Sequence, residues 1–447
     1  MLWRSLSLDI HTSPPAASRR SPSVVRALSG VIATGTLALL AGCPGTPPDD
    51  GPVFNNPEDP TNGGASYIGA AACSACHPDI DAATRLHGHA SALKRSEGAA
   101  PSYPTDAPRA GVPSPPDGYA WTDVSYVIGG HAKGAIFVDR DGYVLTDGVA
   151  GVNTQWNLDL PPNGTSAGFA EYLPAQATRL PFAYDCFRCH TVNPQPQTAD
   201  DPRTQDGRPG IGGTWSEPGV MCEACHGPGS KHAPDPEART MFVDSSAALC
   251  ARCHTAGDDP DVILAADGYV NPNTQYAELR ASGGHADFAC GYCHDPHAST
   301  AYARATGVRN GCVGCHADQN LAFHDGFTFV RGDYVEALTC ESCHMPFTGR
   351  SNSVASADVV GTRDPGRMGD VRGHIFRIDT QAPRYTQMFT PDGTQVIKDE
   401  KGHAGVSLDF VCLRCHNGIG NAFVISSDGA AVIATQMHQN AAAAASE

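Results

Sequence analysis

Large apolar side chains are scarce in this chain of 447 residues, of which 41% are hydrophobic and only 7% are aromatic. The same chain contains 48 glycines and 35 prolines, a composition that is rich in loops. A large aliphatic core is therefore excluded as the main organising element. We expect another apolar component to fill much of the interior.

The apolar run near the N-terminus, residues 28–40, is too short to cross a membrane as a helix. Four arginines precede this run and the residues LAGC, ending at Cys43, follow it, which is typical of an export signal. LAGC resembles a bacterial lipobox, in which the cysteine becomes the lipidated first residue; an ordinary secretory signal with a chance cysteine is the alternative. We predict a lipoprotein signal peptide over residues 1–42 and an exported protein anchored through Cys43, most simply to the outer membrane on its periplasmic or cell-surface face.

Basic residues are also few, 30 against 47 acidic ones. Removal of residues 1–42 takes away four Arg and one Asp, leaving 26 basic and 46 acidic side chains and a net charge of -20. Such a surface repels nucleic acid and anionic lipid. Nucleic-acid binding is therefore excluded, and membrane association is expected only through the acyl chains on Cys43.

No cysteine is left unassigned by motif. Of 17 cysteines, one is Cys43, and the other sixteen form eight C-x-x-C pairs that are each followed at once by histidine. Structural zinc sites and disulfide frameworks are the alternatives, but neither requires that histidine. C-x-x-C-H attaches c-type haem, because the two thiols form thioethers to the porphyrin and the imidazole reaches the iron from one face. The sequence therefore predicts eight haem c groups.

The predicted thioether residues are Cys73, Cys76, Cys186, Cys189, Cys222, Cys225, Cys250, Cys253, Cys290, Cys293, Cys312, Cys315, Cys340, Cys343, Cys412 and Cys415. The predicted proximal iron ligands are His77, His190, His226, His254, His294, His316, His344 and His416.

The spacing of the motifs predicts one haem-packed domain rather than a repeat array, since consecutive motifs lie at unequal distances. We expect a mostly α-helical and irregular multihaem cytochrome c fold with two small β elements. The stretch AIFVDRDGYVLTD predicts a hairpin around Asp141-Gly142, and HIFRID and TPDGTQVIKD predict short strands. The predicted segments are a flexible tether at 43–66, an octahaem domain at 67–421 with a β insert at about 119–160 and a cysteine-free insert at 345–411, and a C-terminal tail at 422–447.

Each iron has a second face, and ten histidines remain outside the motifs and the signal peptide. Ten are enough to give every haem a second imidazole. His89, His232 and His297 are the best placed, because each is close to a motif whose own iron it cannot reach; each is predicted to ligate a neighbouring haem. The distal candidates are His89, His232, His285, His297, His324, His374, His131, His403, His438 and His87, of which His131, His403 and His438, and His87 beside His89, are the weaker.

The chain resembles the multihaem cytochromes related to hydroxylamine oxidoreductase, octahaem tetrathionate reductase and the multihaem nitrite reductases. The resemblance rests on CEACHGPGSKH, CGYCHDPH, LTCESCHMP and GHA (88–90), and covers Tyr67 to about Asn421. It implies that His297 and His232 ligate neighbouring haems. The chain departs from the enzymes of this group: no motif ends in lysine, no mature cysteine is left free, and spacing nominates no tyrosine for a covalent link to haem.

These features favour an electron carrier with mostly bis-histidine haems over an enzyme, in extracytoplasmic or extracellular respiration. The alternative is an oxidoreductase that reduces a small nitrogen or sulfur oxyanion at one open haem. We expect redox partners such as other cytochromes or an extracellular acceptor, and association into filaments is a further alternative.

Overall fold

The computed structural model describes residues 59, 61–159, 165–238, 240, 241, 244–257, 259–351 and 366–438. The predicted signal peptide, the predicted lipidation site Cys43 and most of the predicted tether lie outside these ranges. Within them, no helix has the length and apolar character needed to cross a membrane.

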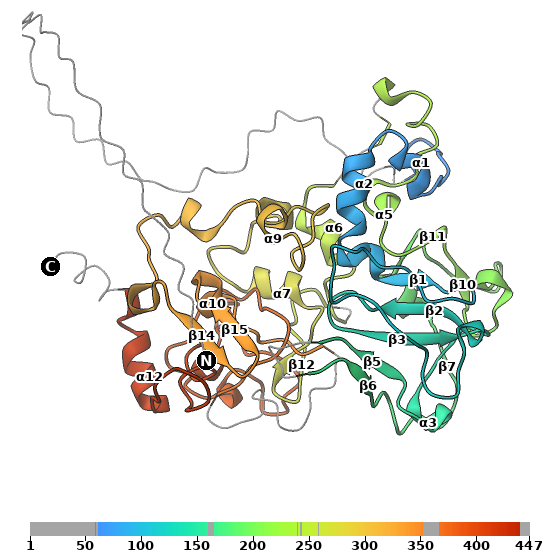
Figure 1. Cartoon of the computed structure of the whole chain (residues 1–447). Helices are drawn as coiled ribbons and strands as arrows, with labels where there is room; N and C mark the ends of the chain where they lie inside the picture. Colours follow the sequence, from blue (N-terminus) through green and yellow to red (C-terminus); the bar gives the residue numbers. More distant parts are fainter. Residues whose placement is uncertain are drawn as a thin grey trace, which may run out of the picture. The chain divides into compact units, whose positions relative to one another are not determined.

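The helices are short (Figure 1). Several of them, such as α5, α8 and α10, contain the cysteines of a haem attachment motif. The described part has no α-helix longer than eight residues, because glycine and proline interrupt most segments. The α-helices are α1 (Ala70–Ser74), α2 (Pro78–Arg85), α3 (Asp147–Ala150), α4 (Tyr184–Phe187), α5 (Cys222–His226), α6 (Ala247–Ala251), α7 (Gln275–Arg280), α8 (Cys290–Cys293), α9 (Arg304–Gly307), α10 (Cys340–His344), α11 (Leu408–Val411) and α12 (Ser427–Ala434). Single 3-10 turns include η1 (Gly88–Ser91), η6 (Cys312–Gly314) and η7 (Ala322–His324).

One antiparallel sheet of seven strands packs against the motif-bearing helix α4 through Phe187. Its strands are β1 (Leu93–Arg95), β2 (Val124–Gly129), β3 (Gly134–Asp139), β4 (Tyr143–Val144), β5 (Gln155–Asn157), β6 (Gly168–Ala170) and β7 (Leu180–Pro181). Alternate residues of β2 and β3 enter two different apolar clusters, Tyr126 and Val138 on one face and Val127 and Phe137 on the other. The sheet is therefore buried on both faces.

The predicted hairpin around Asp141-Gly142 is present as β3 and β4. Gly142 has φ +92°, and a Cβ there would lie 2.6 Å from Ile211 Cγ1, so both the turn and the close approach require glycine. The sheet extends beyond the expected insert at 119–160, because β1 pairs with β2 from the N-terminal side and β7 pairs with β4 from the C-terminal side.

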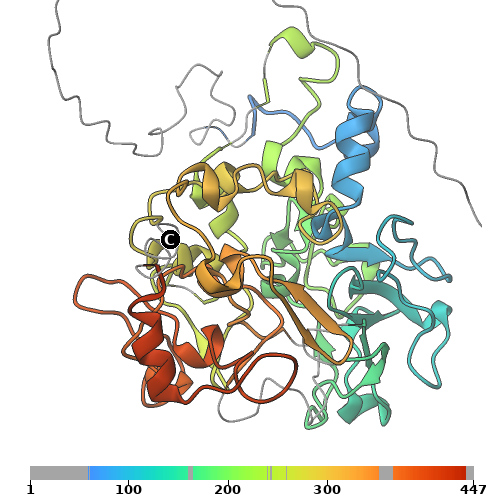
Figure 2. The ribbon, with the colours of Figure 1, turned by 60° about the vertical axis from the view of Figure 1, so that its left-hand side comes forward.

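Four two-stranded sheets complete the described strands. Their strands are β8 (Thr191–Val192) with β11 (Glu217–Pro218), β9 (Gln195–Pro196) with β10 (Gly213–Thr214), β12 (Ala265–Ala266) with β13 (Tyr269–Val270), and β14 (Thr328–Arg331) with β15 (Tyr334–Ala337). In the insert at 345–411 the expected short strands are reduced to isolated bridges such as Ile378 with Val406 and Phe389 with Val396. The sheet and the C-terminal segment lie on opposite sides in both views (Figures 1 and 2).

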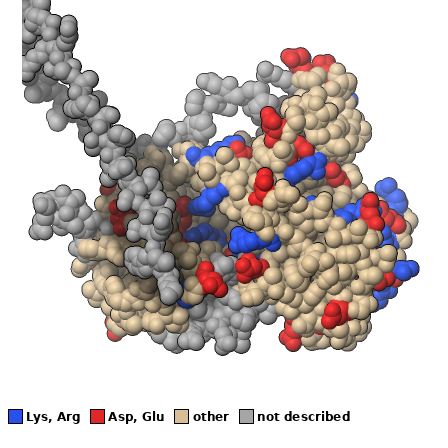
Figure 3. Space-filling view, in the orientation of Figure 1, with Lys and Arg blue, Asp and Glu red and all other residues tan. Residues whose placement is uncertain are grey.

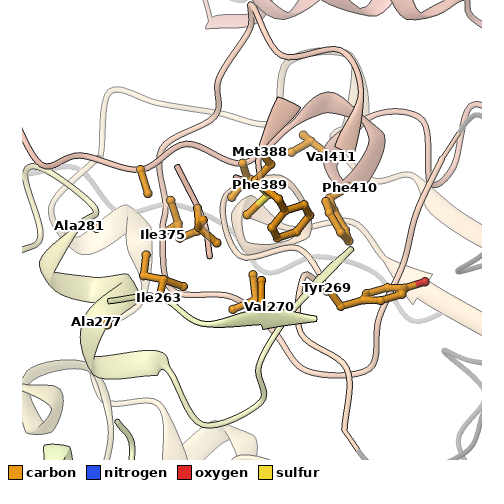
Figure 4. Close-up of a cluster of buried hydrophobic side chains, with 14 residues drawn as sticks. Ile263, Tyr269, Val270, Ala277, Ala281, Ile375, Met388, Phe389, Phe410 and Val411 are labelled. Carbon is orange, nitrogen blue, oxygen red and sulfur yellow. The ribbon is translucent and has the colours of Figure 1, made fainter. Parts of the chain in front are cut away.

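The largest apolar cluster lies in the C-terminal part and is centred on Ile375, Phe389 and Phe410 (Figure 4). Cys343 and Cys412, from two different motifs, pack against it. The cluster therefore fixes the last two motifs relative to the residues of the cysteine-free insert.

Candidate haem sites

The attachment motifs share one local conformation. In five of them the histidine N–H donates to the carbonyl of the first cysteine, at 2.9 to 3.0 Å, which closes a single helical turn over C-x-x-C. This turn places both thiols and the imidazole on one side of the backbone. Each site is named below by its first cysteine, so that the Cys73 site comprises Cys73, Cys76 and His77.

Seven of the eight motif histidines face a second imidazole from elsewhere in the chain. The pairs, with the distance between ring centroids, are His77 and His232 (6.4 Å), His226 and His297 (6.1 Å), His254 and His89 (6.1 Å), His294 and His374 (6.1 Å), His316 and His285 (6.0 Å), His344 and His438 (5.9 Å), and His416 and His324 (6.1 Å). In each pair the second histidine lies outside the motif that it faces. His89, His232, His285, His297 and His324 lie near another motif, His374 lies in the insert at 345–411, and His438 lies in the C-terminal tail.

These distances suit an iron held between two imidazoles. A metal to imidazole nitrogen bond is about 2 Å, and the ring centre lies roughly 1 Å behind that nitrogen, so two rings on opposite faces of one metal have centroids about 6 Å apart. Direct stacking would bring the rings closer, as for His87 and His89 at 4.3 Å. The residues present therefore fit bis-histidine haem at seven sites.

Burial keeps several of these imidazoles neutral, which is the form that ligates iron. Burial, together with the neighbouring His87 and His254, lowers the pKa of His89 to about 3. Burial, followed by the charges of His294 and His254, likewise lowers the pKa of His374 to about 3. These side chains are ready to ligate at neutral pH.

Hydrogen bonds to the other ring nitrogen orient the proximal imidazoles. The Nδ1 atoms of His190, His344 and His416 lie 2.7, 2.8 and 2.7 Å from the backbone oxygens of Ala92, Phe376 and Phe423. His254 Nδ1 lies 3.1 Å from the Gln275 side-chain oxygen. Each contact leaves Nε2 for iron and fixes the plane of the ring.

The segment CEACHGPGSKH is held by the buried carboxylate of Glu223. Its oxygens accept the N–H groups of Ile68 and Gly69, at 2.8 to 3.1 Å, and of Gly229, at 2.8 Å. The Asn62 side-chain amide donates to the carbonyls of His226 and Pro228. The start of the folded part is thereby fixed to this segment, and His232 is brought opposite His77.

Proximity of cysteines from different motifs gives the order of the sites in space. Cys73 lies close to Cys222, Cys189 to Cys253, Cys250 to Cys290, and Cys312 to Cys340. Cys225 lies close enough to Cys250, and Cys343 to Cys412, to interact electrostatically. The sites thus form two rows. The first row contains the Cys73, Cys222, Cys250 and Cys290 sites, and the Cys186 site branches from it at the Cys250 site. The second row contains the Cys312, Cys340 and Cys412 sites.

The two rows meet through aromatic and histidine side chains. Tyr292, inside the CGYCH motif, has its hydroxyl 3.8 Å from Cys315 Sγ of the next motif. His285, which precedes CGYCH, faces His316 of the second row. The junction therefore lies between the Cys290 and Cys312 sites.

His190 differs from the other motif histidines. It has no ring contact with another histidine among the residues that the structure describes, and its N–H donates to Phe187 O rather than to the first cysteine of its motif. Within the described ranges, three distal candidates make no ring contact with a motif histidine: His131 uses Nε2 on Leu86 O at 2.9 Å, His87 packs on His89, and His403 lies 3.8 Å from Asp399. The second ligand of the Cys186 site therefore stays a prediction.

A buried ionic network joins the last two motifs. Arg414, the third residue of CLRCH, has a 1% exposed side chain and donates to Glu336 Oε2 at 2.7 Å and to the Ser342 carbonyl of CESCH at 3.0 Å. Burial alone would raise the pKa of Glu336, but the charge and hydrogen bond of Arg414, with Tyr334 and Arg372, lower it to about 2. This network holds the Cys340 and Cys412 sites at a fixed separation.

The ranking of the distal candidates by sequence agrees only in part with their positions in the structure. His438 was among the weaker candidates, yet its ring faces His344 with the planes 18° apart. No local signal could indicate this partner, because the two residues meet only through the packing of the C-terminal segment. Glu336 and Phe376 contact residues of the sites, but neither lies in a recognisable sequence motif.

No protein-family model matches the chain, and no curated protein matches it. Three solved structures are similar, each at 18% identity: the outer cell wall cytochrome OcwA (TM-score 0.46, 83% of this chain and 86% of that one), the octahaem sulfite reductase MccA of Wolinella succinogenes (TM-score 0.47, 78% and 65%), and an undecahaem cytochrome from the S-layer of Carboxydothermus ferrireducens (TM-score 0.38, 74% and 53%). All three are haem proteins by name.

Proposed function

We propose that the protein carries electrons through eight covalently attached haems, seven of them ligated by two histidines. The supporting observation is the set of seven imidazole pairs with centroids 5.9 to 6.4 Å apart, each pair including a C-x-x-C-H histidine. Haem iron, when bound, supplies reversible one-electron chemistry. The protein's own contribution is to fix both imidazoles of each pair and to pack successive motifs against one another.

A carrier needs ligands that stay in place when the charge on the metal changes. The imidazoles of His344, His416 and His285 have little freedom to leave, because backbone carbonyls and a neighbouring ring hold them. The thiol contacts bring consecutive attachment points together, which supports electron passage along each row. This arrangement ends at the Cys73 and Cys412 sites and at the Cys186 branch.

The proposal is tested by counting haems and ligand states in the purified holoprotein. We expect the mass of the chain to increase by eight haems, and electron paramagnetic resonance (EPR) of the oxidised protein to show seven low-spin haems. Fewer than seven low-spin haems would contradict the pairing. Failure of an electrode to reduce all haems of an adsorbed film reversibly would contradict the carrier function itself.

We also propose that the chain is exported and anchored by lipid on Cys43 after removal of residues 1–42, so that the haem-bearing part meets its redox partners outside the cytoplasm. The support is the export signal with its LAGC ending, which belongs to the sequence alone. We propose other cytochromes or an extracellular acceptor as the redox partners. Acidic and basic side chains are interspersed on the face shown in Figure 3, so this face can contact partner surfaces of either charge. The test is the substitution Cys43→Ser. We expect this variant to leave the membrane fraction while its haem content stays unchanged.

A second candidate function is favoured by the Cys186 site. The face opposite His190 has no described imidazole, while His190 Nδ1 is held at 2.7 Å by Ala92 O. A small nitrogen or sulfur oxyanion could therefore be bound and reduced there, with electrons arriving through the contact of Cys189 with Cys253. The test is carbon monoxide added to the reduced protein: binding to one haem in eight supports an open site, and no spectral change removes this function.

A further inference from the structure

Phe376 contacts histidines of three different haem sites. Its ring stacks on His285, with centroids 4.5 Å apart and planes at 24°, and meets His374 edge to face at 6.2 Å. Its backbone oxygen lies 2.8 Å from His344 Nδ1. These histidines belong in turn to the Cys312, Cys290 and Cys340 sites.

The backbone at Phe376 has an unfavourable conformation. Its φ is +58°, a region that bulky residues seldom occupy. The Arg377 N–H donates to Ile375 O at 2.6 Å, which closes a γ-turn centred on Phe376. A γ-turn with positive φ is the rare, strained form of this turn.

The residues on both sides hold this turn in place. Ile375 is fully buried in the cluster of Figure 4. The His374 N–H donates to Glu278 at 2.7 Å, while Arg377 forms an ion pair with Asp399 at 2.7 Å. The surroundings therefore enforce a conformation that aims the Phe376 ring and carbonyl in two different directions at once.

We propose that Phe376 is a positioning residue that sets the orientation of imidazoles at the Cys290, Cys312 and Cys340 sites, and so governs electron passage between the two rows of haems. This inference rests on the proposed function. The junction is where positioning matters most, because between the rows the direct thiol contacts found elsewhere are replaced by Tyr292 and His285.

The ring and the carbonyl have separate roles. The ring lies between His374 and His285, the second ligands of the Cys290 and Cys312 sites, and limits rotation of both imidazoles. The carbonyl accepts from His344 Nδ1 and fixes the plane of the first ligand of the Cys340 site. Since the turn determines both directions, one residue adjusts three sites together.

The experiment compares variants of the full-length holoprotein by EPR and by redistribution of an injected electron after pulse radiolysis. Phe376→Leu removes the ring and keeps an apolar side chain; we expect altered low-spin signals from two haems, with none becoming high-spin, and several-fold slower redistribution. Phe376→Gly also relaxes the strained turn, so a third low-spin signal should change. Phe376→Tyr keeps the ring and should restore the wild-type signals and rate.

Phe389→Leu is the control, because Phe389 is a buried phenylalanine of the cluster that holds Ile375 and makes no ring contact with a histidine among the described residues. It should leave the low-spin signals and the rate unchanged. If Phe376→Leu gives the same spectra and rate as Phe389→Leu, the positioning role is wrong. If the wild-type protein lacks the seven low-spin haems, it is the proposed function that fails, independently of Phe376.

Discussion

The carboxylate of Glu336 offers the sharpest test of how the last two motifs are held together. Its side chain is 6% exposed and accepts from Arg414 at 2.7 Å, Tyr334 at 2.6 Å and Ser342 at 2.8 Å. Arg414 is itself 1% exposed, so the substitution Glu336→Gln leaves a buried guanidinium without its counter-charge. Breaking one side of a buried pair in this way costs about 3 to 5 kcal/mol.

The pKa gives a second route to the magnitude. A pKa lowered from 4.5 to about 2 means that the folded state favours ionised Glu336. At about 1.4 kcal/mol for each pKa unit, this is worth about 3 kcal/mol above pH 4.5. Because the folded pKa is the lower one, this stability is lost as the pH falls from about 4.5 to about 2.

The assay is guanidinium chloride unfolding at pH 7, followed by far-ultraviolet circular dichroism on holoprotein with intact haems. We expect Glu336→Gln to lower the free energy of unfolding by about 3 kcal/mol. The double variant Glu336→Gln, Arg414→Met should recover part of this loss, since no unpaired charge remains. Arg85→Gln, at the exposed ion pair with Asp81, is the control and should cost less than about 1 kcal/mol. A loss for Glu336→Gln no larger than that control would refute the reasoning.

The remaining predictions concern the haem ligands and the N-terminal attachment. His232→Ala should turn the Cys73 haem high-spin while the haem on CEACH keeps its low-spin signal. The control is His403→Ala, because the ring of His403 faces no motif histidine, and this variant should change neither signal. A spectral change in the control would contradict the assignment. The imidazole planes are within 22° of parallel in three pairs and at least 43° apart in four, so the low-spin EPR signals should fall into two groups; a single group would contradict these angles. Glu223→Gln should weaken three backbone contacts and speed proteolysis before residue 70, with haem content unchanged; an unaltered cleavage rate would count against this role of Glu223.

The motif residues and the hairpin could be predicted because their signals are local. C-x-x-C-H specifies two thiols and an imidazole within one turn, and Asp141-Gly142 between alternating apolar residues specifies a hairpin. The seven-stranded extent of the sheet could not be predicted, since β1 and β7 are too short to show a period. HIFRID also misled the strand prediction, because the γ-turn at Phe376 interrupts an otherwise alternating apolar pattern.

The distal ligands depend on contacts between segments that are distant in sequence. His232 and His297 were predictable to the extent that each follows a motif too closely to serve it, although which iron each one reaches was not. His438 and His324 have no such local constraint, and only packing brings them opposite His344 and His416. The second ligand of the Cys186 site stays a prediction, since among the described residues His131 contacts Leu86 O and His403 lies beside Asp399.

The exchange of ligands between sites explains how a chain with few large apolar residues can hold its shape. Each of the seven pairs joins the motif of one segment to a histidine from another, so that each pair, once it ligates iron, would close a loop of the chain. Such closures restrict the unfolded chain, and their ligand bonds add to folding free energy only when the cofactor is present. Haem attachment and folding should therefore be coupled strongly where the described apolar cluster is small, around Ala70, Val192 and Met221 near the Cys73 and Cys222 sites. The C-terminal sites, which pack against the larger cluster and the Glu336 network, should retain more structure when a single distal ligand is removed.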